Sequence, residues 1–175
     1  MNHDTYPDEY IRGVLARVKT IAMVGASANT ARPSYFVLKY LSERGFTMLP
    51  INPGLAGHAI LDLPVYASLA DARQPIDMVD VFRRSDAVGE VVDAALALAL
   101  TTTPKVIWMQ LGVRDDAAAA RAEARGVSVV MNRCPKIEYG RLSGEIGWTG
   151  VNSRILSAKK PTAGVGFQRL SIDKR

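Results

Sequence analysis

The stretch "IAMVGASANTARPSYFVLKYLSERG", residues 21–45, decides the fold. It opens with an apolar strand pattern, turns at Gly25 into a polar loop, and continues as a helical pattern that starts near Ser34 and ends at Gly45. A strand, a loop and a helix in this order are typical of a nucleotide-binding α/β domain. Free N–H groups at the start of such a helix favour an anion, so the loop predicts an anion site.

The usual dinucleotide signature, Gly-x-Gly-x-x-Gly, is incomplete in this loop. Ser27 and Thr30 stand where its second and third glycines are expected, and the second glycine normally lets a pyrophosphate approach the backbone. The end of the next strand should carry an Asp or Glu for the ribose, but it carries Asn52 and Pro53. Both departures weigh against a nicotinamide cofactor, and an NAD(P)-dependent oxidoreductase stays open as an alternative.

The rest of the chain alternates strand and helix patterns. Helical patterns occupy residues 7–19, 34–45, 85–98 and 115–126, and apolar strand patterns occupy residues 20–25, 46–52, 77–82, 105–110 and 127–132. We expect Ser85 to cap the third helix, a short helix near Leu69, and a Gly-rich closing segment at 136–154. The alternation predicts an α/β, Rossmann-like, doubly wound parallel sheet of about five strands with helices on both faces.

Length and charge predict one domain followed by a tail. The 175 residues suffice for a single core, which we place at residues 1–150. That part carries 16 Lys and Arg against 16 Asp and Glu, whereas residues 151–175 carry six against one. No RNA-binding or DNA-recognition motif accompanies this basic C-terminal tail, which favours a solvated, partly disordered tail over a nucleic-acid partner.

Composition also suggests where the protein works. No apolar run approaches the roughly 20 residues of a membrane span, so we expect no membrane partner. The first residues, "MNHDTYPDEY", have neither a basic start nor an apolar signal core. A single cysteine, Cys134, excludes an internal disulfide framework. These features predict a cytoplasmic protein.

Groups suited to catalysis are scarce. His3 and His58 lie in a terminus and in a surface excursion, which does not support a histidine-based acid, base or metal cluster. Asp77 and Asp80 bracket the third strand, and we interpret them as the start of the strand and a source of local hydrogen bonds. The sequence therefore leaves enzymatic activity undecided and favours a protein that is not itself an enzyme.

Cys134 follows the fifth strand, between Arg133 and Pro135 and close to Lys136. Two interpretations stay open for its thiol. Neighbouring cations could lower its pKa and make the protein a thiol-exchange protein. A buried structural cysteine is the commoner case.

Ligands of an open parallel sheet bind beyond the carboxyl ends of its strands. The loops expected there are Gly25–Ser34, Asn52–Pro53, Phe82–Ser85, Gln110–Arg114 and Asn132–Pro135. In the first of them Gly25 permits a tight turn, Ser27 and Ser34 offer hydroxyl donors, and Arg32 adds charge beside a phosphate.

Several motifs in these loops together resemble one family. The run from Gly25-Ala26-Ser27 through Arg32-Pro33-Ser34 to Pro50-Ile51-Asn52-Pro53 is followed by "IDMVDVFRR", "VIWMQLGV" and "GVSVVMNRC". This order resembles the small bacterial CoA-binding proteins, which are similar to the N-terminal domain of the succinyl-CoA synthetase α subunit. The resemblance covers about residues 15–140, with Asn132 in place of the family's usual Asp.

The resemblance implies that CoA or an acyl-CoA is the ligand. Gly25, Ala26, Ser27, Arg32 and Ser34 would then hold the CoA phosphates, Asn52 and Pro53 would shape the nucleotide side, Phe82 and Arg83 would line the next strand's exit, and Gln110 and Cys134 would lie toward the pantetheine side. Cys134 could also form a mixed disulfide with CoA. Ligase activity is not implied, because the second domain of the larger enzyme does not fit in this chain. An exposed apolar patch on the first helix would support a homodimer.

Overall fold

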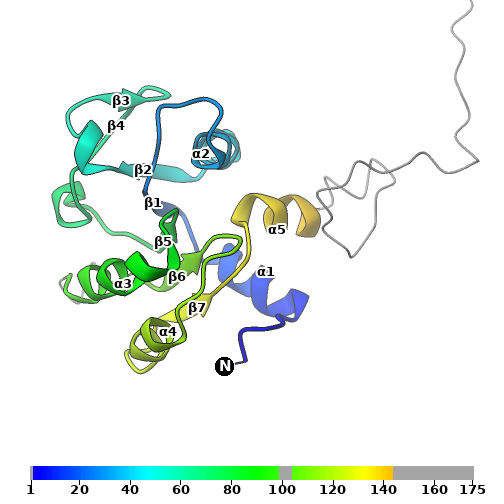
Figure 1. The fold of residues 1–175 in the computed structure, drawn as a ribbon. Helices are drawn as coiled ribbons and strands as arrows, with labels where there is room; N and C mark the ends of the chain where they lie inside the picture. Colours follow the sequence, from blue (N-terminus) through cyan, green and yellow to red (C-terminus); the bar gives the residue numbers. More distant parts are fainter. Residues whose placement is uncertain (1, 99–103, 144–175) are drawn as a thin grey trace, which may run out of the picture.

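A computed structural model describes residues 2–98 and 104–143 of the chain. The strands of its main sheet are β1 (Thr20–Val24), β2 (Thr47–Ile51), β5 (Met78–Val81), β6 (Val106–Met109) and β7 (Ser128–Val130). The helices are α1 (Asp8–Ala16), α2 (Pro33–Glu43), α3 (Val88–Leu96), α4 (Asp116–Glu123) and α5 (Pro135–Leu142). All neighbouring strands are parallel, in the order β2-β1-β5-β6-β7. The expected Rossmann-like sheet is confirmed (Figure 1).

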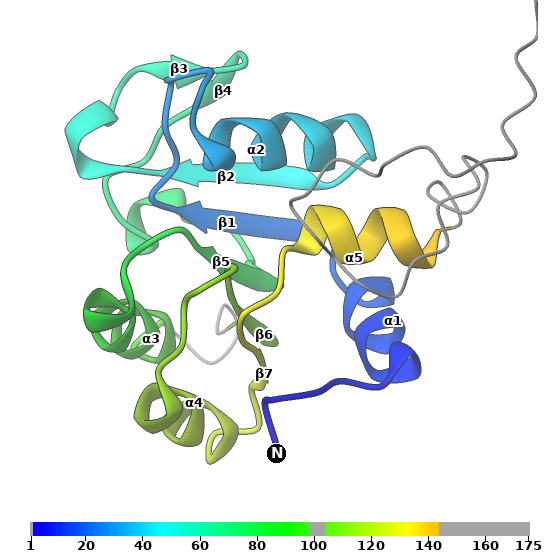
Figure 2. The same cartoon turned by 45° about the vertical axis from the view of Figure 1, so that its right-hand side comes forward.

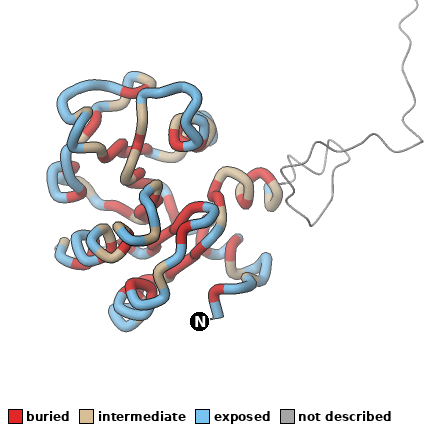
Figure 3. Tube along the Cα trace, viewed as in Figure 1, coloured by how far each residue is buried: buried red, intermediate tan, exposed pale blue. Residues whose placement is uncertain are grey.

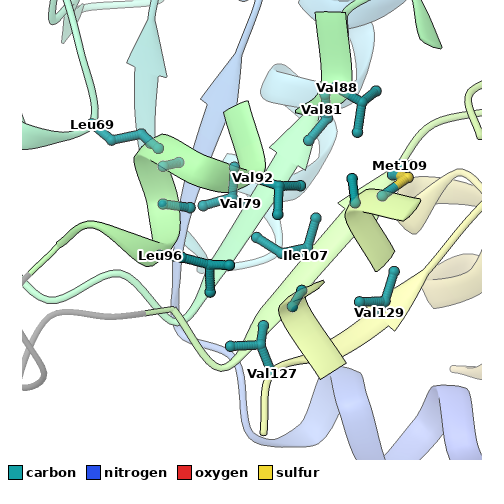
Figure 4. Close-up of a cluster of buried hydrophobic side chains, with 14 of the residues drawn as sticks. Leu69, Val79, Val81, Val88, Val92, Leu96, Ile107, Met109, Val127 and Val129 are labelled. Carbon is teal, nitrogen blue, oxygen red and sulfur yellow. The ribbon is translucent and has the colours of Figure 1, made fainter. Parts of the chain in front are cut away.

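Helices cover both faces of this sheet (Figure 2). Side chains alternate along β5, so Val79 and Val81 belong to the core under α3 and α4, whereas Met78 belongs to the core under α1, α2 and α5. Figure 4 shows the first of these cores, in which Val92 of α3 packs near Ile107 of β6. The strands are buried along most of their length (Figure 3), which explains their continuous apolar patterns.

The strand order creates a crevice at the carboxyl edge of the sheet. From β1 the chain runs outward to the edge strand β2 and then returns to β5 on the other side of β1. The connections that follow β1 and β5 therefore leave in opposite directions, which is the arrangement that opens a ligand site in such sheets.

The excursion between β2 and β5 contains only short elements. They are the 3-10 turns η1 (Pro53–Leu55) and η2 (Ala70–Ala72) and the antiparallel pair β3 (Ala59–Ile60) and β4 (Leu63–Pro64). The short helix expected near Leu69 is confirmed as η2, whose N-cap is Leu69. In the part of the chain that the structure covers, no helix is long and apolar enough to cross a membrane.

Two expectations about helices were wrong. Ser85 does not cap α3, because it lies in the 3-10 turn η3 (Ser85–Ala87) and its hydroxyl accepts a hydrogen bond from the backbone N–H of Arg114. Part of the closing segment is the regular helix α5, which begins with Pro135 and carries an ion pair of 2.7 Å between Arg141 and Glu138. Packing against α1 and α2 stabilises this helix despite its weak periodicity. The remainder of the segment, and the predicted tail at 151–175, lie outside the described residues.

The apolar patch expected on the first helix is not exposed. Ile11, Val14 and Leu15 of α1 are buried within the same chain, in the core shared with α2 and α5. The expected patch is therefore wrong, and it gives no support for a homodimer.

Candidate functional site

Gly25 ends β1 at the crevice, and two features of the structure require a glycine there. Its φ of +92° lies in the left-handed region, and a Cβ at this position would stand 2.3 Å from the carbonyl oxygen of Phe82. The backbone N–H of Gly25 also donates to the carbonyl of Ile51 at 3.0 Å. The ends of β1, β2 and β5 thus meet at one residue that has no side chain.

Asn52 ties the loop after β1 to the end of β2. Its Nδ2 donates to the carbonyl oxygen of Ala26 at 2.7 Å, and its Oδ1 accepts from the N–H of Gly54 at 2.9 Å. An Asp here would place a carboxylate oxygen against the Ala26 carbonyl, and two acceptors repel each other. The acidic residue of dinucleotide sites would therefore be unfavourable at this position.

The loop between β1 and α2 and the first turn of α2 leave backbone N–H groups without an acceptor in the described residues. The hydroxyl of Ser27 accepts from the N–H of Asn29 at 3.1 Å, and Arg32, the N-cap of α2, makes no side-chain cap. Within the described ranges, no group accepts from the backbone N–H of Ala26, Ser27 or Ser34. Free donors beside a helix N-terminus suit a phosphate.

Two pockets flank the crevice. The α3-side pocket, of about 230 Å³, is lined by Val24, Gly25, Ile51, Asn52, Pro53, Ala67, Ser68, Leu69, Arg83, Ala87, Glu90, Val91 and Ala94. The α2-side pocket, of about 630 Å³, is lined by Pro33, Val37, Phe82, Arg83, Arg84, Gln110, Leu111, Val113, Cys134, Lys136 and Ile137. Arg83 lines both, so the two pockets adjoin at the end of β5. Ala26, Ser27, Arg32 and Ser34 line neither pocket and belong to the loop beside them.

Two arginines at the crevice have no acidic partner in the described residues. Arg32 and Arg83 are exposed, and neither forms an ion pair with any residue of the described ranges. Arg84, by contrast, is paired with Asp86 at 2.7 Å. A guanidinium without a partner can form charge-assisted hydrogen bonds to phosphate.

Asp80 lies beneath the α2-side pocket, and the sequence did not point to it as a site residue. It is 0% exposed, and its Oδ1 accepts from Nε2 of Gln110 at 2.8 Å. Burial raises the pKa of the Asp80 carboxyl to about 7, against the lowering effect of that hydrogen bond. The expectation that Asp80 makes local hydrogen bonds is wrong, because its partner Gln110 lies 30 residues away, in the loop after the neighbouring strand β6.

Cys134 is the N-cap of α5 and is 6% exposed. Burial raises the pKa of its thiol, and the nearby Asp80 carboxyl raises it too, whereas the N–H groups of Ile137 and Lys136 and the charge of Lys136 lower it. Burial is the largest effect. The expectation of a cation-lowered pKa is therefore wrong, and the buried interpretation is confirmed.

Neither His3 nor His58 lines the pockets at the crevice. His58 is exposed, as expected of a surface excursion. His3 is buried, and its Nδ1 lies 3.0 Å from the hydroxyl of Tyr6. Across residues 2–98 and 104–143, no three His, Cys, Asp or Glu side chains are grouped so as to hold a metal ion.

A further cavity, of about 600 Å³, lies between the N-terminal segment and α5. Its lining includes Arg133, Arg141 and the buried Glu138. Here the charges neutralise one another, since Glu138 is bound by both arginines and Arg141 also pairs with Asp8 at 2.8 Å. This cavity therefore lacks the uncommitted cations that the crevice offers.

A parallel sheet of this order, with a glycine turn at its switch point, defines a Rossmann-like α/β fold. Residues 19–140 match the family described as "CoA binding domain", and the chain belongs to this family. The matched range contains every predicted site residue from Gly25 to Cys134. The family resemblance expected from the motifs is confirmed.

The chain is also similar to individual proteins from bacteria and archaea. It is 33% identical to the uncharacterized protein YneT of Bacillus subtilis over 129 residues, which are 74% of this chain and 91% of YneT. A solved structure of a Thermus thermophilus protein, cell-free ID.343, has a TM-score of 0.72 and 34% identity over 78% of this chain and 99% of that one. A hypothetical protein from Pyrococcus horikoshii has a TM-score of 0.73 and 35% identity over 81% and 95%.

Proposed function

We propose that this protein binds CoA or an acyl-CoA across the crevice at the carboxyl edge of its sheet. One observation carries the proposal: the free N–H groups before α2 lie at the switch point, beside two adjoining pockets, in a domain of the CoA-binding family. An anion site beside two adjoining pockets suits a ligand that has phosphates in its middle and a group at each end.

The parts of CoA divide among the predicted residues. The pyrophosphate lies at Gly25, Ala26, Ser27, Arg32 and Ser34. The nucleotide end occupies the smaller, α3-side pocket against Asn52 and Pro53, and the pantetheine arm occupies the larger, α2-side pocket against Phe82, Arg83, Gln110 and Cys134. Arg83 lines both pockets and is placed to contact phosphate.

The proposal is of a binding module that is not catalytic in itself. In the described part of the chain, the buried ionisable groups at the α2-side pocket are Asp80 beneath it and Cys134 in its lining, and burial raises the pKa of each. A fully buried carboxyl and a thiol that is 6% exposed are poor groups for acid–base or nucleophilic chemistry. The structural role of Asn52 also disfavours the oxidoreductase alternative.

Calorimetric titration tests this function. CoA is titrated into the wild type and into Arg83→Ala, and Lys39→Ala serves as the control because it removes one exposed charge from the far part of α2. We expect CoA to bind the wild type, Arg83→Ala to weaken binding about tenfold or more, and Lys39→Ala to have no effect. No binding at millimolar CoA, or tighter binding of NADH than of CoA, would overturn the proposal.

A further inference from the structure

Asp80 and Gln110 form a buried hydrogen bond below the α2-side pocket. Asp80 lies on β5 opposite Trp108 of β6, so Gln110, two residues further on, faces the same side of the sheet. Gln110 is 6% exposed and Asp80 is fully buried, and the Nε2–Oδ1 distance is 2.8 Å. The contact is therefore held by the register of two central strands and is shielded from water.

This bond determines which end of the Gln110 amide turns toward the pocket. An amide has a donor end and an acceptor end, whereas a carboxylate only accepts. The reverse orientation would place Oε1 of Gln110 against an oxygen of Asp80. A proton on Oδ2, which has no hydrogen-bond partner in the described structure, leaves Oδ1 as an acceptor and preserves the arrangement.

The acceptor end is free for a ligand. Gln110 lines the α2-side pocket, and no group of the described residues donates to its Oε1. Unlike Oδ2 of Asp80, this oxygen is not among the fully buried side-chain atoms that lack a partner. The surrounding lining is largely apolar, with Pro33, Val37 and Ile137 nearby, so a hydrogen bond made there is little weakened by water.

We propose that Asp80 is a positioning residue that fixes Gln110 as a hydrogen-bond acceptor for the pantetheine arm of the ligand. This inference rests on the proposed function and deepens it. The pocket then selects a segment that carries an N–H or S–H donor, which the pantetheine arm has in its two amides and its thiol. Asp80 does not touch the ligand and acts only through Gln110.

The test compares two ligands that share their nucleotide end. Adenosine 3′,5′-bisphosphate lacks the pantetheine arm and the second 5′-phosphate of CoA, so the ratio of its dissociation constant to that of CoA measures what these two groups contribute together, and a change of the ratio in a variant at Asp80 or Gln110 reports on the arm. We expect Asp80→Leu, which removes the acceptor that orients Gln110, to reduce this ratio about three- to tenfold without changing the affinity for the bisphosphate. Gln110→Leu, which removes the acceptor itself, gives the same reduction and carries the test if Asp80→Leu does not fold.

A double-mutant cycle separates positioning from a general structural role. Because Asp80 acts through Gln110, Asp80→Leu has no further effect on the ratio in the Gln110→Leu background. Desulfo-CoA, which lacks the thiol, shows which group of the arm donates to Gln110. If Asp80→Leu still weakens the binding of desulfo-CoA, the donor is an amide. If it does not, the donor is the thiol.

Two results would overturn the inference. One is an unchanged ratio in Gln110→Leu, and the other is an effect of Asp80→Leu that remains in the double variant. If the wild type bound neither CoA nor the bisphosphate, the proposed function itself would fail. If the wild type bound CoA but the ratio were the same in the wild type and in Asp80→Leu, the proposed function would stand and only the role of Asp80 would fail.

Discussion

Replacing Gly25 by Ala tests whether the crevice depends on close approach of the ends of β1 and β5. The new Cβ would stand 2.3 Å from the carbonyl oxygen and 3.0 Å from the carbonyl carbon of Phe82. Gly45 provides a matched control. Its φ of +85° is close to the +92° of Gly25, but nothing lies within 4 Å of a Cβ added there.

The two substitutions share one cost and differ in the other. A left-handed φ costs an alanine about 1–2 kcal/mol at either site. At Gly25 the overlap is with backbone atoms, so β1 and β5 must separate, which adds roughly 1–3 kcal/mol. We therefore expect Gly25→Ala to lower the free energy of unfolding by about 2–5 kcal/mol and Gly45→Ala by about 1–2 kcal/mol.

Urea denaturation followed by far-ultraviolet circular dichroism measures both losses, and titration with CoA accompanies it. We expect Gly25→Ala to weaken CoA binding, because the strands that form the crevice have moved, and Gly45→Ala to bind as the wild type does. Equal losses of stability, with CoA binding intact in both variants, would refute the close-approach argument.

Three further outcomes follow from the contacts of single residues. Asn52→Asp destabilises the protein by about 1–3 kcal/mol, because a carboxylate faces the carbonyl of Ala26, whereas Asn29→Asp keeps its acceptor role toward the N–H of Ala31 and is near neutral; denaturation curves that coincide would contradict this. The pKa of Asp80 rises from 3.8 to about 7 on folding, so the unfolded state releases this proton first as pH rises. Between pH 4 and 7 the free energy of unfolding of the wild type therefore falls by up to about 4 kcal/mol relative to that of Asp80→Asn. A difference between the two proteins that does not change with pH would contradict this prediction. Cys134 reacts slowly with Ellman's reagent at pH 7.5 and rapidly in urea; fast, stoichiometric reaction of the folded protein would show an accessible thiolate.

The sheet could be predicted from the sequence because its signals are local and strong. Each strand is a short apolar run, since both faces are covered, and Gly25 and Gly45 punctuate the first strand–helix unit. The loops at the carboxyl edge followed from the parallel topology alone. This is why seven of the predicted site residues line the two pockets: Gly25, Asn52, Pro53, Phe82, Arg83, Gln110 and Cys134.

What the sequence missed depends on contacts between distant segments. Asp80 meets Gln110 only because β5 and β6 pair in one register. Asn52 reaches Ala26 across two strand ends, and Ser85 serves the loop before α4 instead of capping α3. The sequence pattern of α5 is weak, and the helix is stabilised by its packing and by the Arg141–Glu138 pair, which the sequence alone does not reveal.

A crystal structure of the protein with CoA tests the central claim most directly. We expect the pyrophosphate at the N–H groups of Ala26, Ser27 and Ser34, the nucleotide end beside Asn52 and the pantetheine arm in the pocket lined by Gln110. CoA bound in the cavity between the N-terminal segment and α5, with the crevice between β1 and β5 empty, would contradict the account.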